Sequence, residues 1–225
     1  MAYHVRIDPL LGSSVCEFFE SFAGIVSPSV NQNLLTYTLP ALSKTMTEHR
    51  TNPYSSLASR SVDLIDSIFD GRPIDQFSPG LFASVAEVLF ELLIATDDRG
   101  ILQSGLHVIT TVVRKDIDQL LNWYVVSSSS RPSVLTISTT QRKDAANRSG
   151  LELVLSLVAK LLEPSESESG GLFVGDLVIH LIRKAGSQLG PVLPDLLKAF
   201  VTRLATAETA SFSQVSIPFV PFSFG

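Results

Sequence analysis

Histidine and cysteine side chains carry much of the metal binding and nucleophilic chemistry of proteins. In this sequence they lie far apart from one another. The four histidines are His4, His49, His107 and His180, and none has a second ligand at a metal-binding spacing. His107 and His180 fall within apolar helical patterns, so we expect them to be paired with neighbours or placed at the rim of the core. Cys16 has no basic neighbour in the sequence to activate it, which favours a buried structural thiol over a nucleophile.

Phosphate-binding and hydrolase patterns are also missing from the sequence. The glycines are scattered, and neither GxxxxGK[ST] nor GxGxxG occurs. The stretch GSQLG at 186–190 lacks the central serine of a nucleophile elbow. Trp123 follows a helical pattern and is expected to fill an edge of the core rather than to bind a ligand. We therefore predict no catalytic residue, no metal ligand and no cofactor, and a protein that is not an enzyme.

The elements that position these residues are predicted to be helices almost throughout. Apolar residues recur at helical spacing in eight ranges, which are 11–22, 34–46, 57–69, 81–95, 101–113, 151–162, 173–182 and 189–204. Ser149 and Glu152 have the spacing of a capping box at the start of one helix, and Gly186 is expected to end another. Val134 to Ile137 is the only candidate strand. The predicted fold class is all-α.

The helices also form pairs of similar length. Pairing 31–48 with 56–70, 80–96 with 98–115, 148–163 with 171–186 and 189–205 with 208–222 gives units of about 40–46 residues, the period of HEAT and armadillo arrays. Two weakly similar stretches of the sequence place Pro40 and Pro194 in the first turns of two helices, where a missing N–H costs least. These patterns predict a HEAT-repeat α-solenoid of antiparallel helix pairs.

One segment interrupts this succession of helices and divides the chain. Residues 1–126 are expected to form HEAT-like repeats, 127–147 a flexible insertion rich in serine and threonine, and 148–225 further HEAT-like repeats. The tail departs from the helical pattern because Pro218 and Pro221 do not suit a helix interior.

The composition agrees with such an array. Hydrophobic residues make up 45% of the 225 residues and charged residues 17%, which excludes a disordered chain. Apolar stretches are broken well short of the about 20 residues that span a bilayer, so no membrane insertion is expected, and the amino terminus is not a signal peptide. Interior repeats pack on both neighbours, which explains the excess of apolar residues.

The charge balance points away from nucleic acid. The net charge is −5, and it is concentrated in the first 120 residues. An acidic half could attract a basic protein by long-range steering, although ordinary solubility explains the same balance.

The stretch from 170 to 214 resembles the karyopherin-β (importin-β) superfamily of nuclear transport receptors, most closely the importin nine branch. The resemblance rests on similar residues at Phe173–Gly175, Leu177, Val178, Leu181, Ile182, Lys184–Gly186, Leu189, Gly190 and Ala207–Thr209, and upstream at Leu102, Gln103, Gly105 and Trp123. It is convincing over about 100–214.

The resemblance implies a segment of a longer superhelical receptor that shuttles between cytoplasm and nucleus. Such a receptor imports basic cargo, such as histones or ribosomal proteins, releases it on binding Ran-GTP, and contacts nuclear pore proteins. The amino-terminal repeats that bind Ran in the family have no counterpart here, so Ran-GTP is expected to act through the full-length receptor.

In the family the second helix of each pair lines the concave face, and this implies cargo-binding acids. The candidates are Asp63, Asp66, Asp70, Asp116, Asp118, Glu163, Glu166 and Glu168. Solvated helix-face, cap or loop residues are the alternative for each of them. For the whole chain, the alternatives are a HEAT or armadillo scaffold unrelated to transport and a helical enzyme.

Overall fold

The computed structural model describes residues 9–25, 27–49, 56–126, 147–162 and 170–206, and within them the chain is all-α apart from one short sheet. The elements are α1 (Pro9–Ile25), α2 (Pro28–His49), α3 (Leu57–Asp70), the 3-10 helix η1 (Ile74–Gln76), α4 (Ala83–Ala95), α5 (Arg99–Leu121), β1 (Tyr124–Val126), β2 (Asn147–Ser149), α6 (Gly150–Leu162), α7 (Gly170–Leu189) and α8 (Leu193–Thr206). Each of the eight helical patterns in the sequence corresponds to one of the eight α-helices found within these described ranges. The expected helix at 208–222 and the candidate strand Val134–Ile137 lie outside the described residues.

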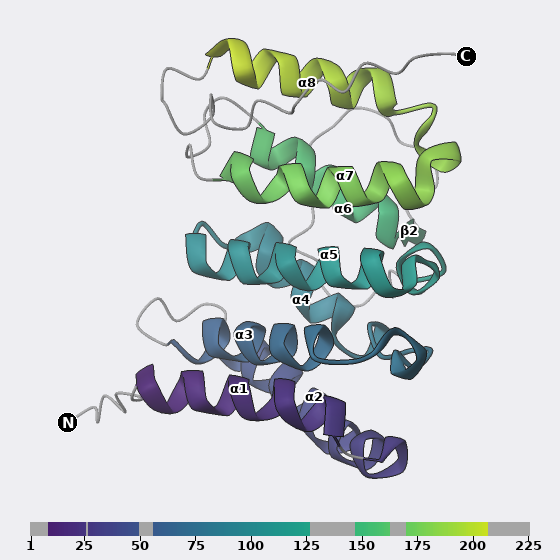
Figure 1. Cartoon of the computed structure of the whole chain (residues 1–225). Coiled ribbons are helices and arrows are strands. Elements are labelled where there is room, and N and C mark those ends of the chain that lie inside the picture. Colours follow the sequence, from purple (N-terminus) through teal and green to yellow (C-terminus); the bar gives the residue numbers. More distant parts are fainter. Residues whose placement is uncertain (1–8, 26, 50–55, 127–146, 163–169, 207–225) are drawn as a thin grey trace, which may run out of the picture.

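The helices are arranged in two layers (Figure 1). α1, α3, α5 and α7 contact one another in chain order and form the odd layer, while α2, α4, α6 and α8 do the same and form the even layer. Contacts between α2 and α3, α4 and α5, and α6 and α7 join the layers. Each interior helix is therefore covered on three sides, and only a narrow strip of it meets solvent.

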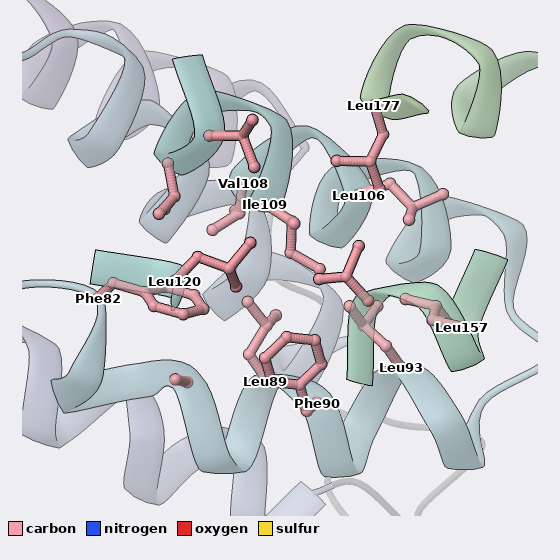
Figure 2. Packing of buried hydrophobic residues seen from close by; sticks show 14 of the residues in the cluster. Phe82, Leu89, Phe90, Leu93, Leu106, Val108, Ile109, Leu120, Leu157 and Leu177 are labelled. Carbon is pink, nitrogen blue, oxygen red and sulfur yellow. The ribbon is translucent and has the colours of Figure 1, made fainter. Parts of the chain in front are cut away.

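The core lies between the layers and continues from one helix pair to the next. Figure 2 shows side chains of α4, α5, α6 and α7 converging, among them Leu93, Leu106, Leu157 and Leu177. All four are buried, and burying a leucine stabilises a fold by roughly 1.5–3 kcal/mol. This continuity explains why the sequence is so apolar for its length.

Trp123 lies at the edge of this core, as its position after a helical pattern predicts. It is partly buried, stacks on Phe90 with ring centroids 5.5 Å apart, and meets Phe82 edge-on at 6.0 Å. The aromatic rings fix the end of α5 against α4. The prediction of a core-edge role is confirmed.

The start of α6 is fixed by local hydrogen bonds and by close packing. The backbone N–H of Ser149 donates to the Glu152 carboxylate at 2.9 Å, and the N–H of Glu152 donates to the Ser149 hydroxyl at 3.2 Å, which confirms the predicted capping box. At Gly150, a Cβ atom would lie 2.5 Å from the carbonyl oxygen of Leu120. Only glycine allows α6 to begin this close to the end of α5.

A two-stranded antiparallel sheet brackets the serine- and threonine-rich segment. β1 pairs with β2, with Tyr124 opposite Ser149 and Val126 opposite Asn147. The sequence analysis missed both strands because each is only three residues long. The expected insertion at 127–147 thus has its last residue within a strand, and 127–146 lie outside the described residues.

One predicted helix boundary is wrong. α2 begins at Pro28, so Pro40 lies in its interior and not in its first turns; the first turns are polar and escape a search for apolar periodicity. Pro194 is in the first turn of α8, as expected. α7 extends to Leu189, but Ala185 has non-helical backbone angles, so the helix is interrupted one residue before Gly186, close to the predicted end.

Candidate functional site

Three of the acidic residues singled out in the sequence lie on one side of α3. Asp63, Asp66 and Asp70 are three and four residues apart, a spacing that aligns side chains along a helix. They reach towards α5, the next helix of the odd layer, and each contacts a side chain there. We call the set the α3–α5 polar row; its members are Asp63, Asp66, Asp70, Ser104, His107, Arg114 and Lys115.

Asp63 is held from both helices. The Ser104 hydroxyl of α5 donates a hydrogen bond to Oδ1 of Asp63 at 2.6 Å. On α3 itself, the Arg60 guanidinium lies 3.5 Å from Oδ2. Both carboxylate oxygens of Asp63 therefore have partners within the protein.

Asp66 and His107 form the central pair of the row. Nδ1 of His107 lies 2.7 and 2.8 Å from the two carboxylate oxygens of Asp66. The hydrogen bond that the imidazole donates to Asp66 raises the pKa of His107 above 6.5. Burial raises the pKa of Asp66 above 3.8, and the nearby carboxylates of Asp63 and Asp70 add to the rise, whereas His107 opposes it.

Two cations of α5 hold the carboxyl end of α3. Arg114 makes an ion pair with the Asp70 carboxylate. Nζ of Lys115 donates to the backbone carbonyls of Phe69 and Arg72, each at 2.6 Å, and to that of Asp70. A helix leaves its last carbonyls without donors and favours a cation there, so Lys115 completes α3 from another helix. Burial lowers the pKa of Lys115, and Asp70 opposes that shift.

Asp116 and Asp118 lie beyond this row, at the carboxyl end of α5. Asp116 has non-helical backbone angles, and its carboxylate accepts a hydrogen bond from the Gln119 amide at 3.0 Å. Gln119 in turn donates to the carbonyl of Ser78 and accepts from the N–H of Phe82. Asp116 thus orients a side chain that holds the turn before α4, whereas Asp118 is exposed.

The other acidic candidates, Glu163, Glu166 and Glu168, lie outside the described residues. The structure therefore brings together three of the eight predicted residues, and it places two others at the end of the following odd-layer helix.

The sequence analysis missed the basic and polar partners on α5. Their signal was present, because Ser104 and His107 follow Asp63 and Asp66 by 41 residues each, about one helix pair later. A search for complementary polar residues separated by about 41 residues would have found Ser104 and His107. It would also have indicated that these carboxylates face partners of the same chain.

A buried arginine was also missed. Arg72 is 4% exposed, and its guanidinium donates to the side-chain carbonyl of Asn31 and to the backbone carbonyl of Gln76. Burial lowers its pKa. Asn31 is on α2, and Arg72 therefore joins the two layers behind the polar row.

The remaining candidates for chemistry have structural surroundings. His180 contacts the backbone carbonyl of Asp176 one turn earlier at 3.0 Å, and His107 pairs with Asp66, as expected of satisfied or rim histidines. Cys16 is a free thiol that is half-buried, not fully buried as predicted. In the described ranges, no three His, Cys, Asp or Glu side chains are placed to hold a metal ion, and no helix has the length and apolarity to cross a membrane.

The polar row is thus a near-balanced set of charges with partial access to solvent. The Asp66 side chain is 23% exposed and that of Asp70 is 44% exposed, so outer carboxylate edges can still meet a partner. No protein-family model matches the chain.

Proposed function

We propose that the chain is a HEAT-repeat α-solenoid, part of a nuclear transport receptor of the karyopherin-β type, and that it binds basic protein cargo. The observation that carries this proposal is that hydrogen-bonded residues on successive helix pairs are separated by a similar length of sequence, mostly 41–46 residues. Ser43 bonds the backbone of Ser84 across 41 residues in the even layer. Asp63 to Ser104 and Asp66 to His107 span 41 residues in the odd layer.

This separation supports a repeat. If each pair repeats the one before, equivalent positions meet at the repeat length, and HEAT and armadillo units have about 40–47 residues. Lys160 bonds the carbonyl of Ile94 across 66 residues, a distance in sequence that includes the segment between β1 and β2. Contacts between neighbouring pairs in both layers are the packing that solenoids use.

The cargo proposal is supported by the charge of the odd layer. In family members the second helix of each pair lines the inner surface, and here α3 and α5 hold that place in their pairs. Exposed edges of Asp66 and Asp70, together with Asp118, offer a basic partner several weak contacts. Electrostatic contacts of this kind favour fast association and partner selection more than tight binding.

A binding experiment tests the cargo proposal. We expect the purified chain to bind histones or ribosomal proteins, with affinity falling as salt rises, and to ignore an acidic protein of similar size. Asp66→Asn with Asp70→Asn should weaken histone binding several-fold, whereas Asp195→Asn on α8 serves as the matched control. Equal binding of basic and acidic proteins would contradict the proposal.

Ran sensitivity separates this proposal from its rival. Since the acids of the polar row are paired with α5, an interaction scaffold unrelated to transport is the second candidate. A receptor that contains this chain should release its cargo when Ran-GTP is added and should enter nuclei through the pore. A complex that survives Ran-GTP would favour the scaffold.

A further inference from the structure

The Asp66–His107 pair of the polar row lies where the protein meets solvent. The His107 side chain is 48% exposed and that of Asp66 is 23% exposed, so a partner can reach the pair from outside. Nδ1 of His107 lies 2.7 Å and 2.8 Å from the two carboxylate oxygens of Asp66. The imidazole therefore faces both of the oxygens with which Asp66 would contact a cation of the partner.

The charge of this pair depends on how many protons it holds. The net charge is +1 when both groups are protonated, 0 when one proton has left and −1 when both have left. Because the two groups are in contact, they titrate as a unit, and the pair becomes more negative as pH rises whichever group releases the last proton. The hydrogen bond that His107 donates to Asp66 raises the pKa of His107 from its usual 6.5, which places the last step above pH 6.5.

No neighbouring group opposes this change of charge. The charged side chains that surround the pair are Asp63 and Asp70 of α3 and Arg114 and Lys115 of α5. Burial lowers the pKa of Lys115 from its usual 10.5, and loss of its proton at high pH acts in the same direction as loss of a proton from the pair. Among the described residues, no charged side chain of α4, α6 or α7 acts on His107, although these helices also contact α5.

We propose that the last proton of the Asp66–His107 pair controls the binding of basic proteins to the polar row. A pair that holds this proton has no net charge and attracts a lysine or arginine weakly. A pair that has lost it carries a full negative charge, and the cation of the partner takes the place of the proton. This inference rests on the proposed function, because it assigns a regulation to the same surface.

The test measures the binding of an arginine-rich peptide to the full chain at low salt, from pH 6 to pH 9. A peptide of arginine and serine with both ends blocked has no group that titrates in this range, so a change in affinity comes from the protein. The parent chain should bind about fivefold more tightly at pH 9, the effect of one unit charge about 4 Å from a cation in water. His107→Gln retains a hydrogen-bond donor without a charge, and it should bind at pH 6 nearly as tightly as the parent chain does at pH 9.

The matched control is His180→Gln. His180 also lies beside an aspartate, with Nδ1 3.4 Å from Oδ1 of Asp176, but the two are on α7 and outside the polar row. This variant should keep the full dependence on pH. A second measurement needs no variant: by linkage, saturating peptide should lower the pKa of His107 in the parent chain, which the NMR shifts of its ring protons report.

The outcomes separate this inference from the function on which it rests. Peptide binding that is equally tight from pH 6 to pH 9, a dependence on pH that persists in His107→Gln, or a pKa of His107 unchanged by peptide would overturn the inference alone. Absence of peptide binding over the whole range would overturn the proposed function as well. Circular dichroism of His107→Gln should match that of the parent chain, since the side chain is half exposed.

Discussion

α5 packs on two neighbours of its own layer, and the two interfaces have different chemistry. Towards α3 it presents Ser104, His107, Arg114 and Lys115, which bond carboxylates and carbonyls. Towards α7 it presents apolar side chains such as Leu106, which Figure 2 shows beside Leu177. Hydrogen bonds are directional and fix how far one helix is shifted along another, whereas apolar contact is not. The comparison suggests that the α3 side sets register and the α7 side supplies most of the free energy.

The largest expected effect is on the apolar side. Leu177→Ala removes a fully buried side chain between α7 and α5, and a cavity of that kind costs about 2–5 kcal/mol. Chemical denaturation with urea measures the free energy of unfolding. Ile74→Ala, at an exposed apolar side chain, is the control and should change stability by less than about 0.5 kcal/mol. Equal losses in the two variants would refute the proposed difference.

A smaller loss is expected from Lys115→Met. The substitution keeps the length of the side chain but removes the hydrogen bonds that Lys115 donates to the carbonyls of Phe69, Asp70 and Arg72, at a cost of about 1–3 kcal/mol. Lys44→Met is the matched control, because Lys44 is exposed and pairs only loosely with Glu48 at 3.7 Å. Hydrogen exchange should show the loss at the end of α3 first. Unchanged exchange there would contradict the capping role.

The ion pair of Asp70 and Arg114 should contribute still less. Both side chains are nearly half exposed, and solvent screening limits such pairs to about 1 kcal/mol or less. A double-mutant cycle with Asp70→Asn and Arg114→Gln gives the coupling free energy directly. The coupling should shrink at high salt; a salt-independent coupling would mean that the pair acts by packing.

The smallest effect is a dependence on pH. The folded-state pKa of His107 is raised, so the stability it contributes is fully present below its unfolded value of 6.5 and is lost as pH rises through the folded value. After allowance for solvent screening, the loss between pH 6 and 8 should be a few tenths of a kcal/mol. The folded-state pKa of Asp66 is raised as well, so its contribution to stability changes with pH in the same direction. His107→Gln should abolish this change of the free energy of unfolding with pH, and His180→Gln should leave it unaltered.

The positions of the helices could be predicted from the sequence, but the tertiary contacts between them could not. Apolar periodicity located α1 to α8 because each buries a stripe, and the capping box at Ser149 was readable because it is local. It failed where tertiary contact decides the outcome. Pro40 was misplaced because the first turns of α2 are polar.

The contacts of the acidic residues on α3 could not be predicted from the sequence for the same reason. Helical spacing aligned Asp63, Asp66 and Asp70 correctly, but their partners depend on the shift between α3 and α5, which local patterns do not encode. The burial of Arg72 likewise needs Asn31 from the other layer. In the sequence, Asp63 and Ser104, and likewise Asp66 and His107, are linked only by an equal separation of 41 residues.

The small sheet between α5 and α6 has a consequence for how this protein can vary. Because Val126 is paired with Asn147, the chain leaves and re-enters the helix layers at points about 5 Å apart. A segment whose ends are already joined can change in length at little cost, about 0.6 kcal/mol for each doubling. This position is therefore suited to accept a reporter peptide or an added binding motif, and natural variants of the protein should differ in length here first.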